Sequence, residues 1–185
     1  MNWFDSAQEL LSNWKAKDAV AKAVADKFAK TFTPQARRVL DLAFKEAEQL
    51  NNNFIGTEHV LIGLVSSGQS VVVKVLQNLG LNPEAVRKEV ENRVSVGPAQ
   101  TKFGSLPFTP RMKKVLKAAR QQAQLLNHTF VGAEHLLLGL FTESEGVAAQ
   151  VFKHFNLNTE QMRKEILKEL DSDCLSGNDE PKSLE

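Results

Sequence analysis

The sequence contains two copies of one unit, offset by 76 residues. When residues 32–91 are laid on residues 108–167, 24 of 60 positions are identical and no gap is needed. Chance does not produce that agreement, so the repeat constrains the fold more than any single motif does. The identical positions include Phe32-Thr33-Pro34 on Phe108-Thr109-Pro110, Gly56 on Gly132, Glu58-His59 on Glu134-His135, Gly63-Leu64 on Gly139-Leu140 and Arg87-Lys88-Glu89 on Arg163-Lys164-Glu165.

Each copy reads as four helices. Thr33 followed by Pro34 is a strong helix start, because Thr can cap the helix and Pro fits its first position. Apolar residues then recur with helical spacing at positions 36, 39, 40, 43, 44, 47 and 50. Breaks at Asn51-Asn52-Asn53, Gly68 and Gly80 separate three further helices, the second beginning near Thr57 and the fourth at Asn82-Pro83. No stretch alternates long enough to predict a strand, so we expect an all-α fold.

The repeat divides the chain into five parts. Repeat one covers residues 32–94, and repeat two covers 108–170. Between them, residues 95–107 contain Gly, Ser and Pro and read as a linker. Residues 171–185 hold five acids and one Lys, which predicts an acidic, flexible tail.

Residues 1–31 precede the repeat and read as an amphipathic helical extension. Trp3, Phe4 and Trp14 belong to one apolar face of it. The simplest interpretation is helices that pack on the repeats. A docking helix for a partner is the alternative, with Trp3, Phe4 and Trp14 as its contacts. Binding to a membrane surface fits less well, because acids and lysines are mixed on the polar face.

Composition excludes several classes of protein. The net charge is +1 and no basic cluster of the kind expected for nucleic-acid binding is present, although repeat two carries nine basic and six acidic side chains. Cys174 is the single cysteine, so neither an internal disulfide nor a cysteine-based zinc site can form. The start of the chain is no secretory signal, and no apolar run approaches the ~20 residues that span a bilayer. We therefore expect a cytoplasmic protein.

The repeated pattern, F-T-P at a helix start followed by N-x-x-F-[IV]-G-x-E-H-x-L-x-G-L, closely resembles the Clp amino-terminal domain. That domain occurs as a tandem pair at the front of ClpA- and ClpC-type unfoldases, and in small stand-alone proteins associated with Clp proteases. The resemblance covers residues 32–170. It implies two four-helix repeats related by a pseudo-twofold axis, and a role in receiving substrates or adaptors rather than in chemistry.

The same resemblance points to four candidate ligand-binding residues. In some ClpC-like domains the Glu of this motif binds the guanidinium of phosphoarginine, while the phosphate meets the helix that follows the F-T-P segment. This chain carries those groups in both repeats, as Thr33 with Glu58 and Thr109 with Glu134. A carboxylate suits the forked donors of a guanidinium, and a helix N-terminus suits a phosphate. The alternative is that these residues are purely structural.

No catalytic centre, cofactor or metal site is predicted. The chain contains no G-x-x-x-x-G-K-[ST] loop, so we expect no ATP hydrolysis, and no nucleophile motif. Neighbouring Glu and His on a helix point in different directions, so Glu58-His59 and Glu134-His135 do not suggest metal ligation. We expect the histidines to make buried hydrogen bonds and Thr57 to cap its helix, a role that Ala133 cannot fill.

Three functions remain open from the sequence. The first is a non-catalytic interaction module that binds substrates or adaptors for a Clp-type unfoldase or protease. The second is the substrate-receiving front end of a ClpC-type unfoldase whose ATPase modules are absent from this chain. The third, a nucleic-acid or regulatory binder, draws support only from the excess of basic side chains in repeat two, where Lys113, Lys117 and Arg120 form a stripe that also fits a solvated helix face.

Overall fold

The computed structural model describes residues 30–68, 70–98 and 106–175, the last five of these as backbone only. Trp3, Phe4 and Trp14 lie outside the described residues. The described part contains eight helices and two isolated β-bridges, so the predicted all-α fold is confirmed. None of these helices is both long and apolar enough to cross a membrane.

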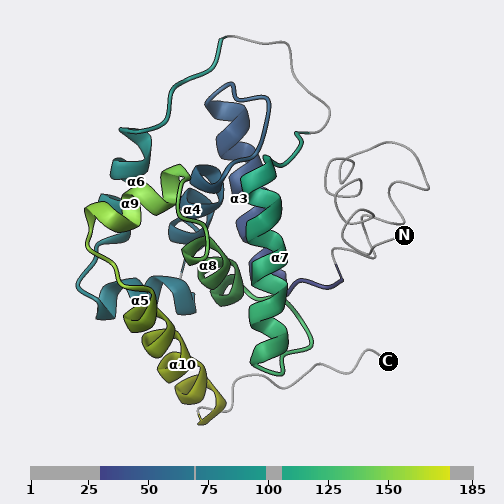
Figure 1. Cartoon of the computed structure of the whole chain (residues 1–185), viewed down its shortest axis with the longest axis vertical. Coiled ribbons are helices and arrows are strands. Elements are labelled where there is room, and N and C mark those ends of the chain that lie inside the picture. Colours follow the sequence, from purple (N-terminus) through teal and green to yellow (C-terminus); the bar gives the residue numbers. More distant parts are fainter. Residues whose placement is uncertain (1–29, 69, 99–105, 176–185) are drawn as a thin grey trace.

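Each repeat supplies four helices in the same order (Figure 1). Repeat one forms α3 (Pro34–Gln49), α4 (Thr57–Val65), α5 (Val71–Asn78) and α6 (Pro83–Glu91). Repeat two forms α7 (Pro110–Leu125), α8 (Ala133–Phe141), α9 (Val147–His154) and α10 (Thr159–Leu175).

The local signals in the sequence explain where the long helices begin and end. The hydroxyl of Thr33 accepts from Ala36 N at 3.2 Å, and that of Thr109 accepts from Met112 N at 3.1 Å, so both act as N-caps. Just past their C-terminal ends the chain turns at Asn51 and Asn127, whose φ angles of 52° and 56° are left-handed. Asn tolerates this conformation better than most residues, which is why each helix stops there.

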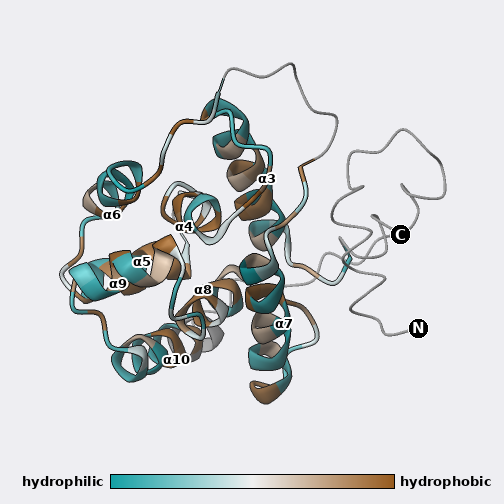
Figure 2. Cartoon of the chain, turned by 45° about the horizontal axis from the view of Figure 1, so that its top comes forward, coloured by the Kyte–Doolittle hydropathy of each residue, from teal (hydrophilic) through white to brown (hydrophobic). Residues whose placement is uncertain are grey.

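The core of the domain is built around α4 and α8. Both helices are apolar on nearly every side and almost fully buried, and they contact each other between the remaining helices (Figures 1 and 2). Gly63 lets α4 pack closely on α3, because a Cβ added there would meet the backbone oxygen of Val39. Gly139 has the same relation to the backbone oxygen of Val115.

Two short β-bridges join the repeats and are related by a pseudo-twofold axis. Phe32 of repeat one bridges Val131 of repeat two, and Ile55 of repeat one bridges Phe108 of repeat two. Adding the 76-residue offset to one bridge generates the other with the partners swapped, which is the signature of twofold symmetry. Helix contacts cross between the repeats as well, since α5 packs on α10 and α6 on α9.

One element extends beyond the predicted boundary. Helix α10 continues to Leu175, five residues past the expected end of repeat two at 170, whereas its counterpart α6 ends at Glu91. After α6 the chain is instead held against the end of α3, where Gly97 N donates to Leu50 O at 2.8 Å.

Candidate functional site

The four candidate residues come together across the repeats, not within them. Thr33 N donates to Val131 O at 3.0 Å, which places the start of α3 beside the segment that leads into α8 and Glu134. Thr109 N donates to Ile55 O at 3.0 Å, which places the start of α7 beside the segment that leads into α4 and Glu58. We call these composite sites the α3–α8 site (Thr33 and Glu134) and the α7–α4 site (Thr109 and Glu58).

The sequence presents these groups repeat by repeat, as Thr33 with Glu58 and Thr109 with Glu134, whereas the backbone bridges bring the segments of different repeats together. Helix α4 packs across the middle of α3, because a Cβ added to Gly63 would meet Val39 O, and Gln35 near the start of α3 donates from Nε2 to Ser67 O, just past the end of α4, at 3.2 Å. Glu58 lies at the other end of α4, nine residues or about 14 Å along the helix from Ser67, and so away from the start of α3. Sequence spacing could not reveal that the partner comes from the other repeat.

Each glutamate occupies the second position of its helix and folds back over the N-cap glycine. A Cβ added to Gly56 would meet the carboxylate of Glu58, and one added to Gly132 would meet that of Glu134. Both glutamate side chains are only 14% exposed. A carboxylate in the first turn is stabilised by the positive end of the helix dipole.

The two motif histidines cap the same helices. His59 Nδ1 accepts from Gly56 N at 2.9 Å, and His135 Nδ1 accepts from Gly132 N at 2.8 Å. This confirms the expected buried hydrogen bonds. Burial lowers the pKa of His59, although Glu58 beside it acts in the opposite direction. The neutral ring, with Nδ1 as an acceptor, is the form that this hydrogen bond requires.

Thr57 does not cap α4, contrary to expectation. Gly56 is the N-cap, and Thr57 is the first helical residue, with its hydroxyl 3.3 Å from Glu58 Oε2. Its side chain is buried near repeat two, because a Cβ added to Gly146 would meet Thr57 Oγ1. The helix begins one residue earlier than the motif suggests, and the side chain that stabilises its start is His59, which accepts from the N–H of the N-cap residue Gly56.

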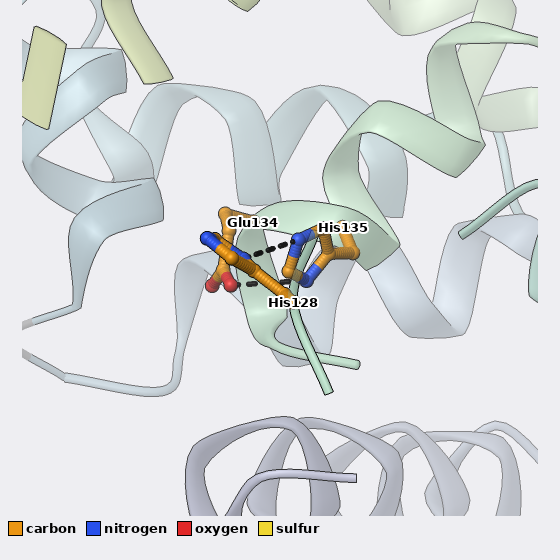
Figure 3. A group of neighbouring side chains, drawn as sticks. All are labelled: His128, Glu134 and His135. Atoms are coloured by element: carbon orange, nitrogen blue, oxygen red, sulfur yellow. Dashed lines mark hydrogen bonds and ion pairs between the residues drawn. The ribbon is translucent and has the colours of Figure 1, made fainter. Parts of the chain in front are cut away.

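His128, which no motif in the sequence marks, joins Glu134 and His135 in one cluster (Figure 3). His128 Nδ1 lies 3.0 Å from His135 Nε2, and Glu134 Oε1 lies 3.0 Å from His135 Nδ1. Burial would raise the pKa of Glu134, but the neighbouring ring of His135, the backbone N–H of Glu134 itself and the ring of His128 lower it. The carboxylate is therefore ionised at neutral pH.

The cluster has three possible metal-ligand atoms within 4.8 Å of one another, yet its hydrogen bonds disfavour a metal. Gly132 N–H points at His135 Nδ1, so the proton of the neutral ring resides on Nε2. A metal on Nε2 would force a proton onto Nδ1, against Gly132 N–H, and a metal on Nδ1 would displace that N–H. Either mode breaks the cap of α8, so we assign a hydrogen-bonded cluster.

A cavity of about 580 Å³ opens at the start of α7. Thr109, Arg111 and Lys114 line one wall, and the loop after α8 lines the other. Arg111 pairs there with Glu145 at 3.2 Å and with Glu143 at 3.9 Å. The corresponding contact in repeat one is neutral, since Gln35 stands in place of Arg111 and binds a backbone oxygen. The start of α7 is therefore the more strongly charged of the two.

Comparisons with known proteins agree with this architecture. A model of the Clp repeat (R) N-terminal domain matches residues 31–155 and 108–173. A probable ATP-dependent Clp protease ATP-binding subunit of Chlamydia pneumoniae is 46% identical over 141 residues, which are 76% of this chain and 17% of that protein. The negative regulator of genetic competence ClpC/MecB of Bacillus subtilis is 44% identical over 141 residues, again 76% of this chain and 17% of that protein.

Solved structures show the same fold. The N-terminal domain of the chaperone ClpD from Arabidopsis thaliana superposes with a TM-score of 0.61 and 25% identity, covering 77% of this chain and 96% of that one. The Hsp104 N-terminal domain of Candida albicans superposes with a TM-score of 0.65 and 17% identity, covering 80% and 93%. The chain belongs to the Clp repeat N-terminal domain family.

Proposed function

We propose that this chain receives protein substrates or adaptors for a Clp-type ATP-dependent unfoldase or protease. The support is family membership together with the names of the relatives, which are ATP-binding subunits of Clp proteases and Clp chaperones. The chain spans only 17% of the length of those relatives, so the activity of the whole relatives is not carried over to it.

The ligand we propose for each composite site is an arginine side chain carrying a phosphate. The observation that carries this proposal is the pairing of an ionisable carboxylate from one repeat with a capped helix N-terminus from the other. Glu134 or Glu58 would accept the forked donors of the guanidinium. The first-turn N–H groups and positive dipole end of α3 or α7 would hold the phosphate.

An exposed aromatic residue borders each site and suits a peptide that continues beyond the arginine. Phe130 directly precedes Val131 of the bridge in the α3–α8 site, and Phe54 directly precedes Ile55 of the bridge in the α7–α4 site. Their exposed fractions are 52% and 38%, unusual for large apolar side chains. An apolar side chain beside the modified arginine would pack there.

Calorimetric titration with a short phosphoarginine peptide tests the ligand. We expect two sites in the unmodified chain, one each in Glu58→Ala and Glu134→Ala, and none in the double variant. Glu84→Ala is the matched control, because Glu84 also occupies the second position of a helix but is exposed. Binding that survives in the double variant would remove both glutamates from the site, and no binding by the unmodified chain would reject this ligand.

The broader proposal needs a separate experiment. Sedimentation of the purified chain with a Clp-type unfoldase, with and without ATP, measures direct association. Degradation of a phosphoarginine-bearing protein by the complete protease, with the chain added in excess, measures delivery or competition. A chain that neither associates with the unfoldase nor changes the degradation rate would contradict the proposed function.

A further inference from the structure

The α3–α8 and α7–α4 sites differ in one residue that lies next to the motif histidine. His128 in repeat two corresponds to Asn52 in repeat one. His128 contacts the ring of His135, with the ring centroids 5.0 Å apart and the planes nearly perpendicular. Asn52 instead donates from Nδ2 to the oxygen of Leu50 at 3.4 Å. The twofold symmetry of the fold is therefore broken at a candidate ligand site.

The hydrogen bonds define the proton positions in this cluster. Since His135 Nδ1 accepts from Gly132 N–H, His135 Nε2 carries the proton and donates it to His128 Nδ1 at 3.0 Å. His128 must then be neutral, with its own proton on Nε2. In repeat one, His59 Nε2 is buried and has no hydrogen-bond partner, because no histidine occupies position 52.

Protonation of His128 changes this arrangement in two ways. It places a proton on Nδ1, facing the donor of His135, so the hydrogen bond between the rings is lost. It also creates a cation in the same cluster as Glu134, where an opposite charge at this range is strongly attractive. A guanidinium ligand and protonated His128 would then compete for one carboxylate.

Within the described residues, few other charges lie on the segments next to His128. The last turn of α7 before it, Gln122–Leu126, carries none, and Glu134 and His135 are the titratable residues in the first turn of α8. On the segment of repeat one that pairs with Val131, residues 30–35, the only charge is that of exposed Lys30. Glu134 is thus the acidic group that lies in the cluster with His128.

We infer that His128 is a specificity-determining residue of the α3–α8 site: neutral, it leaves Glu134 available to a guanidinium, and protonated, it occupies Glu134 as a competing cation. The two sites of the chain are then unequal, and only the α3–α8 site releases its ligand in mild acid. This inference rests on the proposed function. It adds a regulation that the repeated motif itself does not contain.

The experiment is a titration with the phosphoarginine peptide at pH 7.5 and 5.5. Glu58→Ala isolates the α3–α8 site and Glu134→Ala isolates the α7–α4 site, so any titration of the peptide itself affects both measurements alike. Competition between protonated His128 and the guanidinium predicts binding that is weaker by roughly tenfold at pH 5.5 than at pH 7.5 in Glu58→Ala. We expect no comparable change in Glu134→Ala.

Exchanging the residues found at the equivalent positions 128 and 52 gives two reciprocal variants. His128→Asn, made in Glu58→Ala, should abolish the pH dependence of the α3–α8 site, and Asn52→His, made in Glu134→Ala, should confer one on the α7–α4 site. Equal pH dependence at the two sites, or pH dependence that persists without His128, would overturn the inference.

A second measurement needs no ligand. The ring-proton resonance of His128 is followed by NMR against pH in the unmodified chain and in Glu134→Gln. If the two groups interact as inferred, His128 titrates at lower pH once the carboxylate is neutral, and an unchanged midpoint would overturn the inference. If the peptide binds neither site, the proposed ligand fails while this titration still decides the role of His128.

Discussion

Glu46 of α3 and Arg87 of α6 are joined by two hydrogen bonds, in which one guanidinium nitrogen lies 3.1 Å from each carboxylate oxygen. Repeat two makes the same connection without the acid, since Arg163 donates to Gln122 Oε1 at 2.7 Å. The two pairs are related by the 76-residue offset. The fold therefore needs a hydrogen-bond acceptor at this position of the first helix, and a charge is not required.

Removal of Arg87 should destabilise the domain more than neutralisation of its partner. Arg87→Ala leaves the carboxylate of Glu46, a residue only 9% exposed, without its cation and should cost about 2–3 kcal/mol. Glu46→Gln reproduces the pair of repeat two and should cost under about 1 kcal/mol, because the guanidinium keeps an acceptor. Urea denaturation measures both. Equal losses would show that the charge itself matters.

Local signals predicted most of the helices, because their causes are local. The Thr-Pro starts, the left-handed asparagines and the spacing of apolar residues act within one helix or one turn.

The composite sites and the role of His128 depend on contacts between distant residues. Nothing in the spacing of Thr33 and Glu134 indicates that a β-bridge between the two repeats brings their segments together. His128 matters only because His135 carries its proton on Nε2 and can donate it to His128. That proton position in turn depends on the hydrogen bond from Gly132 to His135 Nδ1. Such three-residue chains of contacts cannot be read from a repeat pattern.

Glycine substitutions should separate stability from binding. Gly63→Ala places a methyl group against the backbone oxygen of Val39, which cannot move without shifting α3, so we expect a loss of about 1–3 kcal/mol despite the better helix propensity of Ala. Gly132→Ala meets only the flexible carboxylate of Glu134. That variant should lose about 1 kcal/mol or less but weaken phosphoarginine binding at the α3–α8 site.

Thermal melting and the peptide titration, done on the same samples, check this pair. Gly56→Ala in repeat one is the parallel case and should weaken the α7–α4 site instead. A Gly132→Ala variant that keeps full affinity would mean that the carboxylate is not held in its binding position by the space above the glycine.

The capping threonines should tolerate serine and not alanine. Thr33→Ala and Thr109→Ala each remove the oxygen that satisfies a first-turn N–H, at a typical cost of about 1 kcal/mol. Thr33→Ser and Thr109→Ser keep that oxygen and should lie within about 0.5 kcal/mol of the unmodified chain. Chemical denaturation resolves the difference. If serine proved as harmful as alanine, the buried methyl group would be the important part of the side chain.

Stability should fall as the pH drops below about 6.5, and His59 should be one cause. Burial lowers the pKa of His59 in the folded chain, so between that value and 6.5 the unfolded chain binds a proton that the folded chain does not. The free energy of unfolding then decreases with falling pH, by at most about 1.4 kcal/mol per pH unit for one such group. His59→Gln should make the free energy of unfolding depend less steeply on pH. Gln can still accept from the N-cap N–H but does not titrate. His154→Gln, which removes an imidazole at a half-exposed position, is the control for the substitution itself. Urea midpoints at pH 7.5, 6.5 and 5.5 measure the effect, and a slope that persists in His59→Gln would assign it to other groups.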